Sequence, residues 1–407
     1  MSHDQTTGAA SGPAHTPLQP EVSQPVWLGM LGGGQLGRMF VQAAHALGYR
    51  VMVLDPDPDC PASAMADQFV CADYADTRAL TLLGERCQAV STEFENVPAA
   101  GLQQLAHSCR VAPAAECVAI AQDRSAEKRF FDSHTHQFGV RPTPYLELTS
   151  ESGIDRIPDY FLPGVLKTAR MGYDGKGQIR VANRDALLQA FRQLGAVPCV
   201  LEQWLPLASE ISVLVVRGAN GEQVAYPAAE NCHRHGILHT STIPAQSVSP
   251  KVARQAQQAA LAMSTELNYV GVLCIEFFVL QDGSLLVNEM APRPHNSAHY
   301  TLDACHSSQF EQQVRALAGL PLGSATQLAP TIMLNLLGDL WFERESGALR
   351  EPAWQDILAL PAAKLHLYGK QQARPGRKMG HITFVAPTLE QAQAQLQQAC
   401  EVLGIEP

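Results

Sequence analysis

The chain has 407 residues, of which 46% are hydrophobic and 17% are charged, a composition that is ordinary for a soluble globular protein of two or three domains. Its net charge of −10 argues against nucleic acid or an anionic membrane surface as the main partner, because both require a basic binding surface. No segment approaches the roughly 18 consecutive apolar residues that a membrane span needs.

The first 25 residues are rich in Ser, Thr, Pro and Gln and contain neither a basic segment nor an apolar run. We therefore expect a disordered tail over residues 1–25 and no signal peptide. The ten cysteines are scattered, with no Cys-x-x-Cys pair and no regular spacing, so neither a zinc site nor a disulfide framework is predicted. Reduced thiols and a cytoplasmic location are expected.

Residues 26–31 form a short apolar strand candidate that leads directly into Gly32-Gly-Gly-Gln-Leu-Gly37 and a helix. A second strand, residues 51–54, ends in Asp55. Strand, Gly-x-Gly-x-x-Gly, helix and a later acidic residue make up the dinucleotide fingerprint. Alone, the pattern predicts an NAD-dependent enzyme, although such a loop can equally hold the phosphate of a small substrate.

Alternation of strands and helices continues through residues 89–91 and a helix expected from Pro98 to about Val111, which completes an open parallel sheet. Between them, Thr92-Glu-Phe-Glu-Asn96 follows a strand end, where α/β sheets bind their ligands. A polar loop that caps the next helix is an equally good interpretation.

A second domain is expected from about residue 123, and its glycine-rich loop, Met171-Gly-Tyr-Asp-Gly-Lys-Gly177, lies between the strands 164–167 and 178–181. Such a loop can fold over a triphosphate, with backbone N–H groups, Lys167 and Lys176 as donors. It is not a Walker A loop, because the lysine is followed by glycine rather than Ser or Thr. A simple hairpin loop is the alternative.

The segment Cys199-Val-Leu-Glu-Gln-Trp-Leu205 is a strand that ends in polar residues, and Glu210 follows on the next strand. The edge of a strand can bind adenine through backbone groups, and a nearby carboxylate can bind ribose hydroxyls. Each of these residues alone is equally compatible with a structural role. The helix expected over residues 251–267 has an apolar stripe and is assigned to the core.

Two apolar runs flank Asp282-Gly283, which predicts a hairpin with a two-residue loop. In that register Glu276 lies opposite Glu289, about 5 Å away at Cβ, where like charges are destabilising. A Mg²⁺ ion between the two carboxylates would offset the repulsion. The alternative is a solvated sheet face, but Phe278 and Val287 are expected on the same face and would make it apolar.

The loop after the hairpin contains two prolines and brings Arg293, His295 and Asn296 beside the predicted metal. From about residue 325 the pattern changes to short strands, which suggests a small third domain. Within it, Arg374-Pro-Gly-Arg-Lys378 is the densest basic cluster of the chain. It is either a solvated turn or a site for a phosphomonoester, which arginine binds in bidentate geometry.

With these residues in view, the chain resembles the ATP-grasp superfamily and, within it, the family of 5-(carboxyamino)imidazole ribonucleotide synthases, the ATP-dependent carboxylases of purine biosynthesis. The resemblance rests on five segments: Gly34-Gln-Leu-Gly-Arg-Met39, Thr92-Glu-Phe-Glu-Asn96, Gly172-Tyr-Asp-Gly-Lys-Gly-Gln178, Asn288-Glu-Met-Ala-Pro-Arg-Pro-His-Asn-Ser297 and Arg374-Pro-Gly-Arg-Lys-Met-Gly-His381.

The resemblance implies a mixed α/β and α+β fold: a Rossmann-like (pre-ATP-grasp) domain over residues 26–122, a two-lobed ATP-grasp domain over 123–324 and a small C-terminal β-rich domain over 325–407. In this family the first domain binds no dinucleotide, so the NAD interpretation becomes the weaker one. A homodimer is a further implication of the resemblance.

Site residues follow from the resemblance by matching position. The ATP site is implied to comprise Arg124, Lys167, Gly172, Tyr173, Asp174, Gly175, Lys176, Gly177, Gln178, Glu202, Gln203, Trp204, Leu205, Glu210, His233, Asn288 and Glu289. Glu276 and Glu289 would bind Mg²⁺. The substrate ribonucleotide would contact Gln35, Glu93, Tyr173, Asp174, Lys176, Arg293, His295, Asn296, Arg374, Arg377 and Lys378.

The implied reaction uses ATP and bicarbonate to carboxylate the exocyclic amine of 5-aminoimidazole ribonucleotide through carboxyphosphate. Arg293, His295, Asp174 and Tyr173 are the implied catalytic residues, with Arg293 stabilising the carboxyphosphate and His295 or Asp174 handling the amine proton. Another ATP-grasp ligase with a different amine acceptor is the main alternative. A nucleotide sensor without catalytic activity is disfavoured, because it would be expected to lack some of the residues that carry the chemistry.

Overall fold

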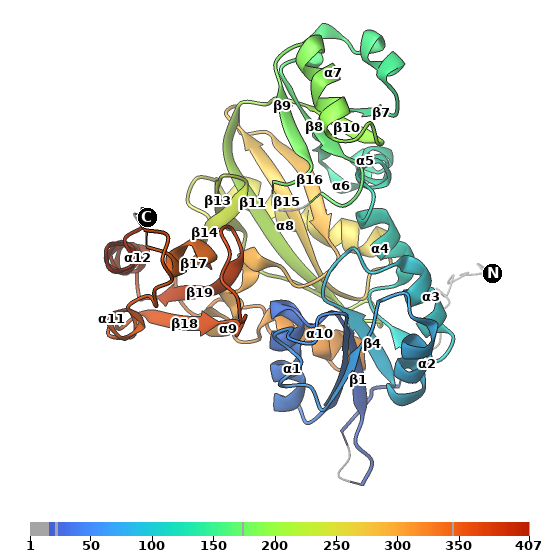
Figure 1. The fold of residues 1–407 in the computed structure, drawn as a ribbon, viewed down its shortest axis with the longest axis vertical. Coiled ribbons are helices and arrows are strands. Elements are labelled where there is room, and N and C mark those ends of the chain that lie inside the picture. The colour runs from blue at the N-terminus through green and yellow to red at the C-terminus, as the bar shows by residue number, and fades with distance from the viewer. Residues whose placement is uncertain (1–15, 21–22, 173–174, 344–345, 407) are drawn as a thin grey trace, which may run out of the picture.

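The computed structural model describes residues 16–20, 23–172, 175–343 and 346–406. Figure 1 shows three regions: an N-terminal α/β region at one end, a central sheet that leads up to a small lobe at the other end, and a C-terminal region beside the central sheet. Among the described residues, no helix is long and apolar enough to cross a membrane.

The N-terminal region is the predicted parallel sheet, with strand order β3-β2-β1-β4-β5. Its strands are β1 (Trp27–Leu31), β2 (Arg50–Asp55), β3 (Gln68–Cys71), β4 (Ala89–Thr92) and β5 (Arg110–Val111). Its helices are α1 (Gln35–Ala46), α2 (Thr77–Arg86), α3 (Ala99–Ala106) and α4 (Ala115–Ala121). The predicted helix from Pro98 to Val111 was too long, because its last residues pair with β4 as the fifth strand of the sheet.

Part of the predicted disordered tail is ordered, since residues 16–20 pack on the N-terminal region. The Leu18 N–H donates to the Ala318 carbonyl at 2.8 Å, and the Tyr49 hydroxyl donates to the Leu18 carbonyl at 2.5 Å. The Arg110 guanidinium donates to the Thr16 carbonyl at 3.0 Å. Composition alone missed these contacts, because they depend on partners far away in the sequence.

The small lobe is an antiparallel sheet with order β7-β10-β8-β9, covered by α7 and two short 3₁₀ helices. Its elements are β7 (Tyr145–Leu148), η1 (Glu151–Arg156), η2 (Asp159–Phe161), β8 (Gly164–Thr168), β9 (Gln178–Val181), α7 (Arg184–Gln193) and β10 (Cys199–Gln203). The predicted strand–loop–strand unit is therefore β8, the glycine-rich loop and β9. Residues 204–206 connect the lobe to the central sheet.

The central sheet has the order β18-β19-β17-β14-β13-β11-β15-β16-β6, with β12 beside β11. Its strands are β6 (Arg141–Pro142), β11 (Leu207–Arg217), β12 (Gln223–Ala225), β13 (Ala229–Arg234), β14 (Ile237–Ile243), β15 (Gly271–Leu280), β16 (Leu285–Ala291), β17 (Thr331–Leu337), β18 (Ala363–Leu367) and β19 (Lys378–Val385). The associated helices are α5 (Arg124–Ser133), α6 (Thr135–Phe138), α8 (Pro250–Glu266), η3 (Asn296–Ala298), α9 (Thr301–Ala304), α10 (Gln309–Ala318), η4 (Gly338–Trp341), α11 (Trp354–Leu358) and α12 (Leu389–Leu403).

The C-terminal region does not have a sheet of its own. Its strand β17 pairs with β14, with Thr240 opposite Leu334, so that β17, β19 and β18 extend the central sheet. The loop between β18 and β19 carries the basic cluster that was predicted from the sequence.

The hairpin of β15 and β16 places Glu276 opposite Glu289 as predicted, but its loop and its strand register differ from the prediction. The Leu280 N–H donates to the Ser284 carbonyl at 2.9 Å, so the loop comprises residues 281–283 and is longer than predicted. A bulge at Asn288 then shifts the register by one residue and restores the pairing of the glutamates.

The same bulge changes the faces of the hairpin. Val287 pairs with Phe277 and packs with it and Ile275 in the core, so its predicted place beside the glutamates was wrong. Phe278 does face the cavity described below. The face that carries the two glutamates is therefore partly apolar through one strand of the hairpin.

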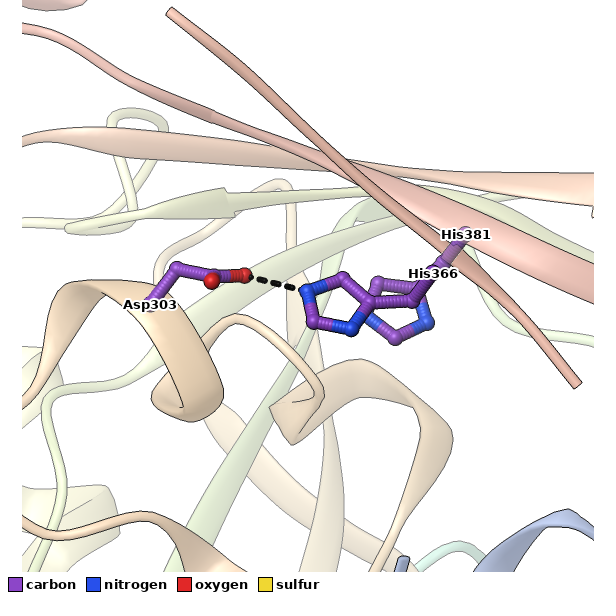
Figure 2. Close-up of side chains that lie close together, drawn as sticks. All are labelled: Asp303, His366 and His381. Carbon is purple, nitrogen blue, oxygen red and sulfur yellow. Dashed lines mark hydrogen bonds and ion pairs between the residues drawn. The ribbon is translucent and has the colours of Figure 1, made fainter. Parts of the chain in front are cut away.

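Three histidines stack where the C-terminal strands meet the loop that follows β16. The His366 and His381 rings are 4.5 Å apart and nearly parallel, at 10°, and His299 stacks on His381 at 4.8 Å. Asp303 accepts a hydrogen bond from His366 at 2.8 Å (Figure 2). The Tyr368 hydroxyl lies 2.9 Å from Nδ1 of His381.

Asp303, His366 and His381 offer possible ligand atoms within 4.8 Å of one another. Figure 2 shows the two imidazole rings one behind the other, so their nitrogen lone pairs lie in separate, parallel planes. A metal ion about 2.0–2.1 Å from both nitrogens cannot lie in both planes. We therefore interpret the group as stacked, hydrogen-bonded histidines.

Burial lowers the pKa of His381 well below its usual value, and the neighbouring His299 and His366 lower it further. The folded protein therefore holds this ring neutral, whereas the unfolded chain takes up a proton below about pH 6.5. We expect the unfolding temperature to fall between pH 7 and pH 5, and to fall less in His381→Gln. Calorimetry at both pH values checks this.

His136→Gln, which removes an exposed histidine, is the matched control and should keep the wild-type dependence. Tyr368 and Asp303 contact the stacked histidines through hydrogen bonds. Burial is the largest cause that lowers the pKa of His299, followed by His295, and the charges of Lys378 and Arg293 lower it further. An unchanged dependence in His381→Gln would contradict the prediction.

Candidate active site

A cavity of about 1820 Å³ lies where the N-terminal region, the small lobe and the central sheet meet. Single ligand pockets are usually about 300–1,000 Å³, so this volume has room for two substrates side by side. Every predicted site residue that the structure describes lines the cavity, except Gly177. The predictions for Tyr173 and Asp174 fall outside the described residues. The role of each lining residue stays a prediction.

The small lobe brings a buried carboxylate between two lysines. Glu202 on β10 pairs through one oxygen with Lys167 at 2.6 Å and through the other with Lys128 at 2.8 Å. Burial raises the pKa of Glu202, but the two lysines outweigh it and hold the pKa below its usual range. The carboxylate is therefore ionised and fixes the Lys167 ammonium at the cavity wall.

The link between the lobe and the central sheet lines the cavity with Gln203, Trp204 and Leu205. Trp204 is 45% exposed, and the Arg180 guanidinium lies 4.4 Å from its ring centroid. On the facing sheet, His233 Nδ1 lies 2.9 Å from Glu210. Apolar and polar side chains together are a suitable environment for a purine ring and its ribose.

Each of the facing glutamates has a cationic neighbour. Arg124 donates to Glu289 at 2.6 Å, and His295 Nε2 lies 3.1 Å from Glu276. Burial raises the pKa of Glu289, but Arg124 and Lys167 lower it to about 2. The repulsion between the glutamates therefore does not by itself require a metal, contrary to the argument from sequence.

The donor set nevertheless suits a hard cation. Both glutamates and Asn288 line the cavity, and the buried Asn288 Oδ1 atom has no hydrogen-bond partner among the described residues. Three oxygen donors from one hairpin match the preference of Mg²⁺ for carboxylate and carbonyl oxygens. The residues present therefore fit this ion.

Arg293 pairs with a residue that sequence reasoning missed. Its Nε donates to Glu95 at 2.5 Å, across 198 positions of the chain. Burial raises the pKa of Glu95, but Arg293 outweighs it and lowers the pKa below its usual value. The turn Thr92–Asn96 was singled out correctly, but Glu93 was chosen from it and Glu95 was not. Glu93 and Glu95 have different partners, which become visible only in the folded turn.

The glycine loop before α1 is occupied by the protein's own carboxylates. Glu93 accepts hydrogen bonds from the Gly34 and Gly37 N–H groups, and Asp55 accepts one from Gly33 at 2.6 Å. These are the groups that a dinucleotide pyrophosphate would require. A Cβ atom on Gly34 would lie 2.5 Å from Glu93, which shows how closely the side chain fits. The NAD interpretation is therefore not supported.

The basic loop reaches the cavity from the C-terminal region, with Arg374, Arg377 and Lys378 in the wall. The Gly338 N–H donates to the Arg377 carbonyl at 2.8 Å, and Asp339 accepts from the Gly376 N–H at 2.7 Å. These contacts fix the backbone of the loop. Its side chains are therefore presented to the cavity instead of forming an isolated solvated turn.

Comparison with known proteins gives a consistent result. Three family models match: the ribonucleotide synthetase preATP-grasp domain over residues 26–122, the ATP-grasp domain over 133–310 and the phosphoribosylaminoimidazole carboxylase C-terminal domain over 331–395. The N5-carboxyaminoimidazole ribonucleotide synthase of Bacillus subtilis is 42% identical over 359 residues, which cover 88% of this chain and 91% of that protein. The chain belongs to the N5-carboxyaminoimidazole ribonucleotide synthase family.

Other members agree with this assignment. The enzyme of Brucella melitensis is 42% identical over 363 residues, covering 88% of this chain and 96% of that protein. A crystal structure of an N5-carboxyaminoimidazole ribonucleotide synthetase with ADP has a TM-score of 0.87 at 35% identity, covering 96% of this chain and 99% of that one. The Aspergillus clavatus enzyme with ADP and 5-aminoimidazole ribonucleotide has a TM-score of 0.83 at 31% identity, covering 93% and 99%.

Family membership makes this chain an ATP-grasp ligase and confirms the predicted fold class. The residues that sequence reasoning missed are Glu95, Glu127 and Lys128, all at or beside the cavity. Glu127 and Lys128 carry no local sequence signal that separates them from the other charged residues of α5, and only their burial distinguishes them.

We expect no saturable NADH binding by this synthase, because Glu93 and Asp55 already occupy the glycine-loop donors. A fluorescence titration of NADH with the purified protein measures it directly. Saturable enhancement of nicotinamide fluorescence at micromolar protein would contradict the assignment of this loop.

Proposed function

We propose that this protein carboxylates 5-aminoimidazole ribonucleotide, using ATP and bicarbonate, to form N5-carboxyaminoimidazole ribonucleotide in purine biosynthesis. The observation that carries the proposal is one cavity lined by two sets of residues, which we assign to an ATP half and a ribonucleotide half. One half contains the lysine–carboxylate wall and the glutamate pair, and the other contains Arg293, Glu95 and the basic loop.

ATP occupies the first half in this proposal. The adenine lies beside Gln203, Trp204 and Leu205, and Glu210 with His233 faces the ribose. Lys167, Lys176 and Arg124 balance the phosphate charge. The glycine-rich loop is proposed to close over the phosphates. Its described residue Gly175 approaches the β13–β14 turn, where a Cβ on Gly236 would lie 3.0 Å from the Gly175 Cα.

Glu276 and Glu289 hold Mg²⁺ in the proposed complex, with Asn288 as a further oxygen donor. A bound Mg²⁺ would neutralise the charge that develops between the β- and γ-phosphate oxygens during phosphoryl transfer. Arg124 then has a second partner in the phosphates, since it donates to Glu289 in the structure.

Bicarbonate attacks the γ-phosphate and gives carboxyphosphate, with ADP as the leaving group. Arg293 stabilises the carboxyphosphate charge, because its guanidinium is held in the cavity wall by Glu95. The carboxyl carbon is then transferred to the exocyclic amine, phosphate leaves, and the amine loses a proton. Among the described residues, the pair of His295 and Glu276, 3.1 Å apart, is proposed to handle that proton, with the carboxylate as its final acceptor.

The ribonucleotide occupies the second half. Its phosphate is bound by Arg374, Arg377 and Lys378, while Gln35 and Asn296 contact the rest of the molecule. Of the two carboxylates in the Thr92–Asn96 turn, we place Glu95 ahead of Glu93 as a substrate contact, because both Glu93 oxygens already accept backbone hydrogen bonds. A cytoplasmic location and a homodimer complete the proposal.

The reaction is tested by ADP release. We expect 5-aminoimidazole ribonucleotide and bicarbonate together to stimulate ADP release, and each alone to stimulate it little. A coupled assay measures the rate. Stimulation by glycinamide ribonucleotide or biotin, but not by 5-aminoimidazole ribonucleotide, would replace the proposed acceptor and leave the ATP-grasp assignment intact.

The metal site is tested by Glu289→Ala. We expect turnover to fall about 100-fold or more, since an oxygen ligand for the ion that stabilises the transferring phosphoryl group is lost. Unfolding temperature should stay close to wild type. Glu147→Ala, which breaks the exposed pair with Arg129, is the control and should keep full activity. Near-wild-type turnover in Glu289→Ala would remove the proposed metal site.

A further inference from the structure

Beside Glu289, the outer edge of β16 is covered by side chains and not by a strand. The short strand β6 pairs with β16 only at Leu286 and Val287. At Asn288 and Met290 the edge of β16 is bound by side chains of α5. An uncovered strand edge leaves backbone N–H and C=O groups without partners, which is costly when the edge is buried.

Two adjacent residues of α5 bind these backbone groups. Lys128 Nζ donates to the Asn288 carbonyl at 2.8 Å, and the Met290 N–H donates to Glu127 Oε1 at 2.6 Å. The two backbone groups flank Glu289 on the same edge of the strand. The two side chains are 0% and 2% exposed, so water does not compete for these hydrogen bonds.

Asn288 is also the bulge residue that brings Glu289 opposite Glu276. A bulge leaves an extra residue outside the regular ladder, and its backbone groups need other partners. Lys128 supplies one, and its other contact is Glu202 on β10 at 2.8 Å. One ammonium group therefore connects the bulge to the small lobe.

We propose that Glu127 and Lys128 are positioning residues for Glu289, which hold the bulge of β16 in the register that places Glu289 opposite Glu276. The inference rests on the proposed metal site but goes beyond it, because neither residue is placed among the ligands. Residues that orient metal ligands change metal affinity about 10–100-fold when they are mutated.

ADP binding with and without Mg²⁺ tests this inference without using turnover. Calorimetry gives the factor by which Mg²⁺ strengthens ADP binding. In Glu127→Leu, which removes the acceptor at similar size, we expect this factor to fall about 10–100-fold while ADP affinity in EDTA changes less than about two-fold. Glu127→Gln keeps an acceptor oxygen and should keep most of the factor. Lys128→Met should behave like Glu127→Leu.

Arg315→Met is the matched control, because it removes a partly buried cation that pairs with Glu311 on α10, away from the cavity. It should leave the Mg²⁺ factor unchanged. A wild-type factor in Glu127→Leu, an equal loss in Glu127→Gln, or an equal loss of ADP affinity with and without Mg²⁺ would overturn the inference. A wild-type factor in Glu289→Ala would instead overturn the metal site itself.

Discussion

Two carboxylates, Glu276 and Glu289, face each other across β15 and β16, and the charges around the cavity are arranged so that Glu289 stays ionised. Arg124 comes from α5 to Glu289, and His295 comes from the following loop to Glu276. The two carboxylates of this hairpin therefore contact α5 at the start of the ATP-grasp region and the loop after β16 towards its end. The Glu289 side chain is 36% exposed, so its pair with Arg124 is partly screened by solvent and serves to position the carboxylate more than to stabilise the fold.

Much of the fold could be predicted from the sequence, because its local patterns agree with the final structure. The glycine-rich loop lies between the two predicted strands, and the strand over residues 178–181 has the predicted bounds. The hairpin shows the limit of such reasoning. The turn was assigned from Asp282-Gly283 alone, yet the register depends on a bulge at Asn288, whose backbone partners lie on a helix about 160 residues earlier.

The candidate site was predicted better as a set of residues than as a set of contacts. Nearly all of the described residues that motif matching predicted line one cavity. It could not distinguish Glu93 from Glu95, because the direction of each side chain is decided by the fold of a turn and by partners elsewhere in the chain. The small C-terminal domain that was predicted matches a family model over residues 331–395, but the sequence did not predict that its strand β17 continues the central sheet through β14.

The glycine loop of the N-terminal region shows how a binding fold can be put to structural use. Glu93 and Asp55 accept hydrogen bonds from its N–H groups in the place that a bound anion would take. In a dehydrogenase such N–H groups bind the cofactor. Here they connect the ends of β4 and β2 to the start of α1. The Thr92–Asn96 turn thereby acquires a fixed position, and with it Glu95, which accepts a hydrogen bond from Arg293 in the cavity wall.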